Sequence, residues 1–331
     1  MKEFIIMQKY MKNNSVIIIC GDPKSTFNEI FIKTFKKKIF KQIKFPIILV
    51  CSETLLKKEF KKFKTKVNLN KFKDFSELKK NKIYLIDIPL DLKKLTKKKV
   101  NSYIKRSFQA GLNLVKKNKS LALINGPISK SNFLKGKYFG ITEYLADKTN
   151  SPSKVMVIFN EKLSVSPITT HVQINDVTRK IDKRKIINNI TIINNFYKKF
   201  LGIKPNIAVT GLNPHCETFR GKDIEKTEIL PAIKILRKKK IKAFGPFSAD
   251  TIFLEDNRKK FNVIVGMYHD QVLGPMKTIF GFNAINITIG LPFLRISPDH
   301  GPNYKMFGQN KSNPDSLIQA FKFLNRYAAK T

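Results

Sequence analysis

The sequence predicts an α/β fold, because two kinds of segment alternate along its 331 residues. Short apolar runs rich in Ile, Leu and Val are typical of buried strands, and the longer lysine-rich stretches between them have the amphipathic pattern of helices. Polar loops that contain Gly or Pro follow several of the apolar runs directly. This alternation is typical of strands and helices packed in layers, and the length favours two lobes or one large unit.

Seven apolar runs predict strands, and four of the intervening segments predict helices. The first ten residues precede a second methionine and the first predicted strand, so we expect them to form an additional arm. The strands are expected at 16–20, 47–51, 83–86, 121–124, 155–159, 207–210 and 263–267. The helices are expected at 29–41, 93–117, 185–200 and 227–239.

The composition favours a protein of the cytoplasm without a membrane partner. No apolar run is long enough to span a membrane, and the opening residues lack a signal-peptide pattern. The three cysteines, Cys20, Cys51 and Cys216, are too few and too scattered for a disulfide framework or a CxxC metal site. A reducing compartment fits this cysteine usage.

The net charge of +40, from 64 basic and 24 acidic residues, raises nucleic acid as a possible partner. Only eight of the basic residues are arginines, however, whereas specific readers of nucleic acid use arginine forks and interleaved aromatic side chains. We therefore interpret the lysines as compositional bias and predict no specific nucleic-acid partner. A charge-driven nucleic-acid-binding protein is the alternative, and its binding would depend steeply on salt.

Polar loops lie directly after the predicted strands, where α/β sheets bind their ligands. The loops that begin at Gly21, Asn125, Gly211 and Tyr268 therefore predict one composite site. A dinucleotide-binding G-x-G-x-x-G after a strand, a P-loop and a G-x-S-x-G elbow are all missing from the sequence. Standard Rossmann, P-loop and serine-hydrolase chemistry therefore have no support.

All four histidines lie in polar, loop-like segments: His171, His215, His269 and His300. Neutral imidazole binds Zn, Co, Ni and Fe, and three imidazoles with an open position form a catalytic site. Their wide spacing leaves two interpretations open, a shared metal ion or ordinary hydrogen-bonded loop histidines.

Further polar side chains stand beside these loops. Asp250 and Asp270 are candidates for a general base or a substrate-ammonium ligand, and the alternative for both is a loop cap. Lys277, Asn286 and Arg295 flank a glycine-containing stretch and offer donors suited to a phosphate. Arg295 stands out in a lysine-rich chain, which favours a geometric role over a surface ion pair.

Taken in order, these loops resemble the signature of the 4-hydroxythreonine-4-phosphate dehydrogenase family of vitamin B6 synthesis. The matching segments include Thr-Gly-Leu-Asn-Pro-His and Tyr-His-Asp-Gln, and they occur in family order across about residues 16–325. The segments that carry the resemblance are 126–130, 142–146, 170–172, 209–215, 245–251, 267–271, 286–295 and 299–301.

The resemblance implies an isocitrate/isopropylmalate-dehydrogenase-like fold of two α/β/α lobes with the active site in a cleft between them. The first lobe is expected at 1–128 plus 305–331 and the second, which carries metal and dimer contacts, at 129–304. It also implies a homodimer whose partner helps complete each site, and NAD or NADP bound in a non-Rossmann mode, in agreement with the missing fingerprint.

The resemblance further assigns roles to the candidate residues. Asp250 and Asp270 would serve catalysis, and Thr142 would bind substrate together with a phosphate clamp. One divalent ion (Zn, Co, Mg or Mn) would be held by three imidazoles. The ligands of that ion would be His171, His215 and His269, and the clamp would be Lys277, Asn286 and Arg295.

The implied reaction oxidises 4-phosphohydroxy-L-threonine to a β-keto acid, which decarboxylates to 3-amino-2-oxopropyl phosphate. Two alternatives remain: a sister dehydrogenase acting on 4-phosphothreonate or 4-phosphoerythronate, and a non-catalytic paralogue. A non-catalytic paralogue is disfavoured because the three histidine and two aspartate candidates are all present: His171, His215, His269, Asp250 and Asp270.

The sequence departs from the family pattern at four places. Ile141 replaces a histidine expected at the substrate, and residues 21–29 lack the usual glycines and second proline. The run after His215 is shortened, and Pro302 and Asn303 replace Thr-Ala near the expected cofactor. These changes bear on substrate identity and cofactor preference and leave the histidines intact.

Overall fold

The computed structural model describes residues 14–117, 120–134, 136–138, 140–218, 223–281, 283–298 and 302–328. The expected N-terminal arm and His300 lie outside these ranges. The chain divides into two compact units, which we call the first unit (1–149 with 292–331) and the second unit (150–291). The sequence-based division placed 129–149 and 292–304 in the second lobe, whereas in the structure both segments pack within the first unit.

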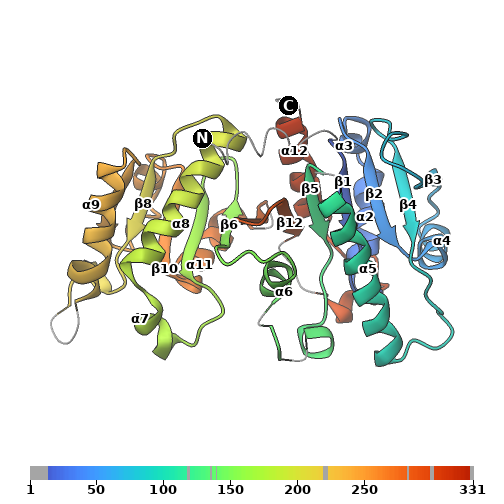
Figure 1. Cartoon of the computed structure of the whole chain (residues 1–331), viewed down its shortest axis with the longest axis horizontal. Helices are drawn as coiled ribbons and strands as arrows, with labels where there is room; N and C mark the ends of the chain where they lie inside the picture. The colour runs from blue at the N-terminus through green and yellow to red at the C-terminus, as the bar shows by residue number, and fades with distance from the viewer. Residues whose placement is uncertain are drawn as a thin grey trace. The chain divides into compact units, whose positions relative to one another are not determined.

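The first unit is built on parallel strands in the order β3-β4-β2-β1-β5-β12 (Figure 1). Its central strands are apolar and buried along their whole length, as expected for a parallel sheet covered on both faces. The strands are β1 (Val16–Ile19), β2 (Ile47–Cys51), β3 (Leu69–Lys71), β4 (Ile83–Asp87), β5 (Ala122–Asn125) and β12 (Leu294–Pro298).

Helices cover this sheet. The longest, α5, lies in front of the strands in Figure 1 and packs closely on β1, because a side chain at Gly111 would lie 2.4 Å from the Ile19 side chain. The helical segments are α2 (Phe27–Phe35), α3 (Lys38–Lys41), α4 (Glu53–Lys62), α5 (Lys97–Lys117), η1 (Lys130–Leu134), α6 (Ile141–Lys148), η6 (Tyr304–Met306) and α12 (Asp315–Ala328).

The second unit has strands in the order β11-β6-β7-β10-β8-β9. The last four are mutually parallel, while β6 runs antiparallel to β7 and β11. The strands are β6 (Val155–Phe159), β7 (Ser164–Thr169), β8 (Ile207–Thr210), β9 (Ala243–Phe247), β10 (Val263–Tyr268) and β11 (Ile285–Ile289).

Helix α11 (His269–Phe280) packs on β7 and β10 and buries Val272, Leu273 and Met276 in the core of this unit. The other helical segments are η2 (Ile174–Asp176), α7 (Val177–Lys180), α8 (Lys183–Phe196), η3 (Tyr197–Leu201), η4 (Pro214–Cys216), η5 (Glu225–Ile229), α9 (Leu230–Lys238) and α10 (Glu255–Arg258). The predicted α/β class is confirmed. Among the described residues, no helix combines the length and apolar character that crossing a membrane requires.

Candidate functional site

Four adjacent parallel strands of the second unit deliver the predicted catalytic and metal-binding residues to one edge of the sheet. Strand β7 ends just before His171, β10 runs directly into His269, β8 leads into the loop that carries His215, and β9 ends three residues before Asp250. Two of these strands, β7 and β9, were not predicted from the sequence. Their order, β7-β10-β8-β9, makes neighbours of side chains that lie far apart in the chain.

His171 and His269 lie side by side at this edge. Their ring centroids are 6.2 Å apart and their planes are inclined by 33°. His269 Nδ1 lies 2.6 Å from Asp270 Oδ1, and its side chain is 36% exposed. A carboxylate in this position fixes the orientation of the imidazole ring.

His215 lies on a strained turn. His215 and Cys216 both adopt the left-handed region, with φ of +55° and +61°, which non-glycine residues rarely occupy unless the surroundings impose it. The start of the loop before His215 is held by Glu225, whose buried carboxylate accepts hydrogen bonds at 2.8 Å from the backbone N–H groups of Leu212 and Asn213. Burial acts to raise the pKa of Glu225, but the hydrogen bonds from Asn213 and Leu212 outweigh it and the pKa lies below its usual range.

Asp250 lies beside His215 on the neighbouring strand end. The Ser248 hydroxyl donates a 2.7 Å hydrogen bond to its carboxylate. This hydrogen bond, followed by the charge of His215, holds the pKa of Asp250 below its usual range. The carboxylate is therefore ionised at neutral pH and available as a proton acceptor.

The donors at this edge suit a divalent metal ion in their chemistry, because imidazoles and carboxylates are its common ligands. Their geometry in one chain is incomplete. Within the described ranges, no three His, Cys, Asp or Glu side chains gather closely enough to hold an ion. These four side chains lie instead as two pairs, His171 with His269 and His215 with Asp250.

Two of the predicted substrate residues meet in the first unit. Arg295 on β12 is 2% exposed, and its guanidinium donates to Asn125 Oδ1 at 2.8 Å and to Thr142 Oγ1 at 3.0 Å. Burial lowers the pKa of Arg295 to about 10, although the charge of Glu143 opposes this shift. The guanidinium is therefore not a surface charge, and the geometric role expected of it agrees with these contacts.

The other two residues of the expected clamp belong to the second unit. Lys277 lies in the last turn of α11, and Asn286 lies on β11 opposite Ile158. The Asn286 Oδ1 atom is buried and has no hydrogen-bond partner. A buried amide oxygen without a partner is unusual in a folded protein and is expected where a ligand completes the structure.

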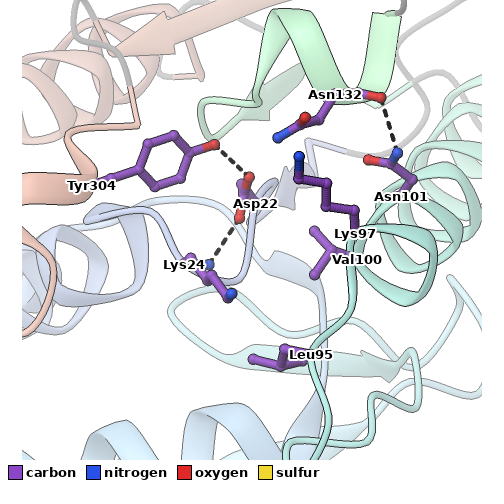
Figure 2. Close-up of a pocket in the computed structure, with 8 residues that line it drawn as sticks. All are labelled: Asp22, Lys24, Leu95, Lys97, Val100, Asn101, Asn132 and Tyr304. Atoms are coloured by element: carbon purple, nitrogen blue, oxygen red, sulfur yellow. Dashed lines mark hydrogen bonds between the residues drawn. The ribbon is translucent and has the colours of Figure 1, made fainter.

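Two of the segments that depart from the family pattern meet in the first unit. Thr26 N donates to Pro302 O at 3.1 Å, and the Tyr304 hydroxyl donates to Asp22 Oδ2 at 2.8 Å. Burial and this hydrogen bond raise the pKa of Tyr304 to about 12. Figure 2 shows Asp22 and Tyr304 among the side chains that line a hollow. The volume of this hollow is about 90 Å³. The hollow is lined by Asp22, Lys24, Leu95, Lys97, Val100, Asn101, Asn132 and Tyr304.

Several residues of these sites were not found from the sequence. Glu225, Ser248, Asn125 and Glu143 act on the candidates rather than forming loops of their own. Glu143 and Ser248 were inside recognised segments, and Asn125 began the loop after the strand predicted at 121–124, so these three offered a signal in the sequence. Glu225 gave none, because it lies outside every recognised segment.

The arrangement of strands and helices identifies the fold class of the protein. It is similar in fold to isocitrate dehydrogenase from Methylococcus capsulatus, with a TM-score of 0.53 at 12% identity over 96% of this chain and 88% of that chain. The expected isocitrate-dehydrogenase-like fold is confirmed.

Within this class the chain belongs to the family described as pyridoxal phosphate biosynthetic protein PdxA, whose model matches residues 42–324. The 4-hydroxythreonine-4-phosphate dehydrogenase of Sulfurihydrogenibium sp. is 37% identical over 92% of this chain and 95% of its own length. The D-threonate 4-phosphate dehydrogenase of Salmonella typhimurium is 30% identical over 96% and 100%. The crystal structure of 4-hydroxythreonine-4-phosphate dehydrogenase from Klebsiella pneumoniae superimposes with a TM-score of 0.81 at 27% identity, covering 96% of this chain and all of that one. The resemblance drawn from the sequence is confirmed.

Proposed function

We propose that this chain is a cytoplasmic, NAD- or NADP-linked dehydrogenase of 4-phosphohydroxy-L-threonine in vitamin B6 synthesis. The carbinol carbon loses a hydride to the nicotinamide and its hydroxyl loses a proton to a base. The resulting β-keto acid loses carbon dioxide to give 3-amino-2-oxopropyl phosphate. Family membership supports the proposal, and the observation that carries it is the convergence of imidazoles and carboxylates on four neighbouring strand ends.

The residues proposed to hold a divalent ion are His171, His215 and His269. Such an ion lowers the pKa of a substrate hydroxyl and polarises a carbonyl oxygen. Because one chain gathers these imidazoles only in part, we further propose a homodimer in which the second copy contributes to each site.

Asp250 and Asp270 are the proposed residues for proton transfer and substrate binding. Asp250 is the proposed base, because its ionised carboxylate lies beside the proposed metal ligand His215. The Asp270 carboxylate is 86% exposed and bonded to His269, so it can orient that ring while it faces a substrate ammonium group.

Substrate phosphate is proposed to bind the donors of Lys277, Asn286, Thr142 and Arg295. The buried guanidinium of Arg295 is held by two neighbours and is therefore oriented before substrate arrives. Binding energy from a phosphate remote from the reacting carbon positions that carbon for reaction.

A second substrate is favoured by one specific feature. Ile141, at the start of α6 next to Thr142, cannot donate the hydrogen bond that the family histidine would give to substrate. A relative of this chain is named for D-threonate 4-phosphate, which carries a hydroxyl group where 4-phosphohydroxy-L-threonine carries an amino group. The alternative is therefore a sister dehydrogenase acting on 4-phosphothreonate or 4-phosphoerythronate.

The deciding experiment follows NADH formation by absorbance, using purified protein loaded with zinc or cobalt. Each of the three phosphorylated acids is supplied, and a chelated sample and a His215→Ala variant serve as controls. Turnover of 4-phosphohydroxy-L-threonine that disappears in both controls is the expected result. Turnover of only the threonate or erythronate would select the sister enzyme, and no turnover of any of them by metal-loaded protein would remove the proposal.

A further inference from the structure

A single buried side chain joins the strand ends that carry His215 and His269. The Gln271 amide oxygen accepts from Met267 N at 2.6 Å, at the end of β10, and from Thr210 Oγ1 at 2.9 Å, at the end of β8. Its amide nitrogen donates to Gly211 O at 2.8 Å, where the His215 loop begins. The residue is 8% exposed. Both polar ends of the amide are therefore used, and they span two strands.

The local sequence makes room for this contact. Gln271 lies in the first turn of α11, two residues after His269, and its side chain lies against Gly266 of β10. A Cβ atom at Gly266 would lie 2.9 Å from Gln271 Oε1 and 2.4 Å from Val272 Cγ1. Any larger residue at Gly266 would therefore displace the side chains of Gln271 and Val272 from these positions.

Gln271 is buried and its amide is bonded to Met267, Thr210 and Gly211, so it can act on the histidines only through these neighbours. We infer that Gln271 is a positioning residue that fixes the spacing between the His215 loop and the His269 turn. The inference rests on the proposed function in that both histidines are taken as ligands of one metal ion. Glu225 holds the far side of the same loop through Leu212 and Asn213, so the loop is fixed from two sides.

The chain provides a matched control at the opposite end of the same two strands. The Asn262 Oδ1 atom accepts from Asn206 N at 2.8 Å, immediately before β10 and β8 begin. Asn262 therefore links the two strands as Gln271 does, but far from the histidines in strand register. Loss of either amide weakens the same strand pair, and only loss of Gln271 changes the spacing of the ligands.

The test compares wild type with Gln271→Met, which keeps the volume and removes the hydrogen bonds, and with Asn262→Leu. Cobalt(II) affinity is measured on the full chain from the visible absorbance of the bound ion. Hydrogen exchange of residues 211–218 is measured in metal-free protein. Gln271→Glu, which keeps the two acceptor contacts and loses the donor to Gly211, is the reserve variant if Gln271→Met does not fold.

We expect Gln271→Met to weaken cobalt binding by about 10- to 100-fold, the usual effect of removing a residue that orients a metal ligand. Exchange in 211–218 should be faster, while Asn262→Leu should match wild type in both readouts. Equal cobalt affinity in the two variants would overturn the inference. Absence of cobalt binding by wild type would instead remove the proposed metal site, and the exchange data would then decide the role of Gln271: faster exchange supports it and unchanged exchange refutes it.

Discussion

The carboxyl ends of the parallel strands differ sharply between the two units. In the first unit, β1 and β2 end at the buried thiols of Cys20 and Cys51, and β5 ends at Asn125, which is occupied by Arg295. In the second unit, the corresponding ends carry His171 and His215, both exposed. We call these strand ends closed in the first unit, where the named side chains are buried, and open in the second unit, where the imidazoles are exposed.

The electrostatics follow the same division. Burial raises the pKa of the Cys20 thiol well above its usual range, so it stays protonated and unreactive. At the open edge, a hydrogen bond from Ser248 and the charge of His215 lower the pKa of Asp250. A position at a strand end therefore does not by itself make a side chain functional. Burial affects the pKa of the side chain and so decides which protonation state it keeps.

The largest expected effect comes from removing an imidazole of the open edge. We expect His269→Ala to reduce dehydrogenase activity to background, because the variant loses a proposed metal ligand and leaves Asp270 without its partner. Cys51→Ala, at a closed strand end, should retain activity within a few-fold of wild type. The activities of both variants are measured by steady-state NADH formation at saturating metal. Equal losses of activity in His269→Ala and Cys51→Ala would show that the open and closed strand ends do not differ in function.

The next effect concerns the proposed base. Asp250→Asn keeps the size of the side chain and should lower kcat by about 10²- to 10⁴-fold, the usual contribution of general base catalysis. The wild-type rate should fall at acid pH as Asp250 becomes protonated, at a pH below the usual carboxyl pKa because the pKa is lowered. If the fall of the rate at acid pH persists unchanged in Asp250→Asn, the titration of another group causes it.

A substitution at Arg295 tests whether the first unit contributes to substrate binding. Lys cannot reproduce the forked contacts to Asn125 and Thr142, so Arg295→Lys should raise KM for a phosphorylated substrate more than it lowers kcat. The hydrogen bonds lost from this charged group also predict destabilisation by about 1.5–3 kcal/mol. Denaturant unfolding and steady-state kinetics measure the two effects, and an unchanged KM would confine Arg295 to a structural role.

Among the residues that the structure describes, Glu29 in the first unit and Glu225 in the second are buried carboxylates with a lowered pKa. Burial alone would raise both values. Ser312 and Lys33 reverse the shift at Glu29, as Asn213 and Leu212 do at Glu225.

Because these folded-state pKa values lie below the unfolded value of about 4.3, the ionised forms stabilise the fold above that pH. The contribution is lost as the pH falls through the lowered pKa. Glu29→Gln and Glu225→Gln should each flatten the acid dependence of the free energy of unfolding. Only Glu225→Gln should also reduce activity, because Glu225 holds the His215 loop; equal activity in the two variants would show that the loop tolerates its loss.

The smallest effect is chemical labelling of thiols. Cys216 is half-buried beside His215, whereas Cys20 and Cys51 are at most 1% exposed. Mass spectrometry after treatment of native protein with iodoacetamide should find Cys216 modified first, slowly because burial raises its pKa. Modification of all three cysteines at one rate would show that the edge of the first unit opens readily.

The regular part of the fold was predictable from the sequence. Each of the seven predicted strands is present with its ends shifted by at most one residue. Five strands of the described residues were missed, and each departs from a continuous apolar run. β3 is only three residues long, and β11 carries Asn286 and Thr288. β7 contains Pro167 and two serines, β9 contains Gly245 and Pro246, and β12 carries Arg295. Tertiary contacts, including the pairing of β12 with β5, determine these segments instead of local propensity.

The candidate site was predictable as a set of residues but not as a geometry. His171, His215, His269 and Asp250 were recognised from their loops, and the strand order explains why they share an edge. The contacts of Gln271 with Thr210 and Gly211 are buried and join residues far apart in the sequence, so no local sequence pattern predicts them.

The strand order also fixes when the open edge can exist during synthesis of the chain. Strand β10 pairs with β7 on one side and β8 on the other, so the earlier strands lack their shared neighbour until residues 263–268 have left the ribosome. The second unit is one continuous segment, whereas the first unit waits for β12 at its far end. A nascent chain can therefore complete the unit that carries the histidines while the sheet that begins the protein still lacks its last strand.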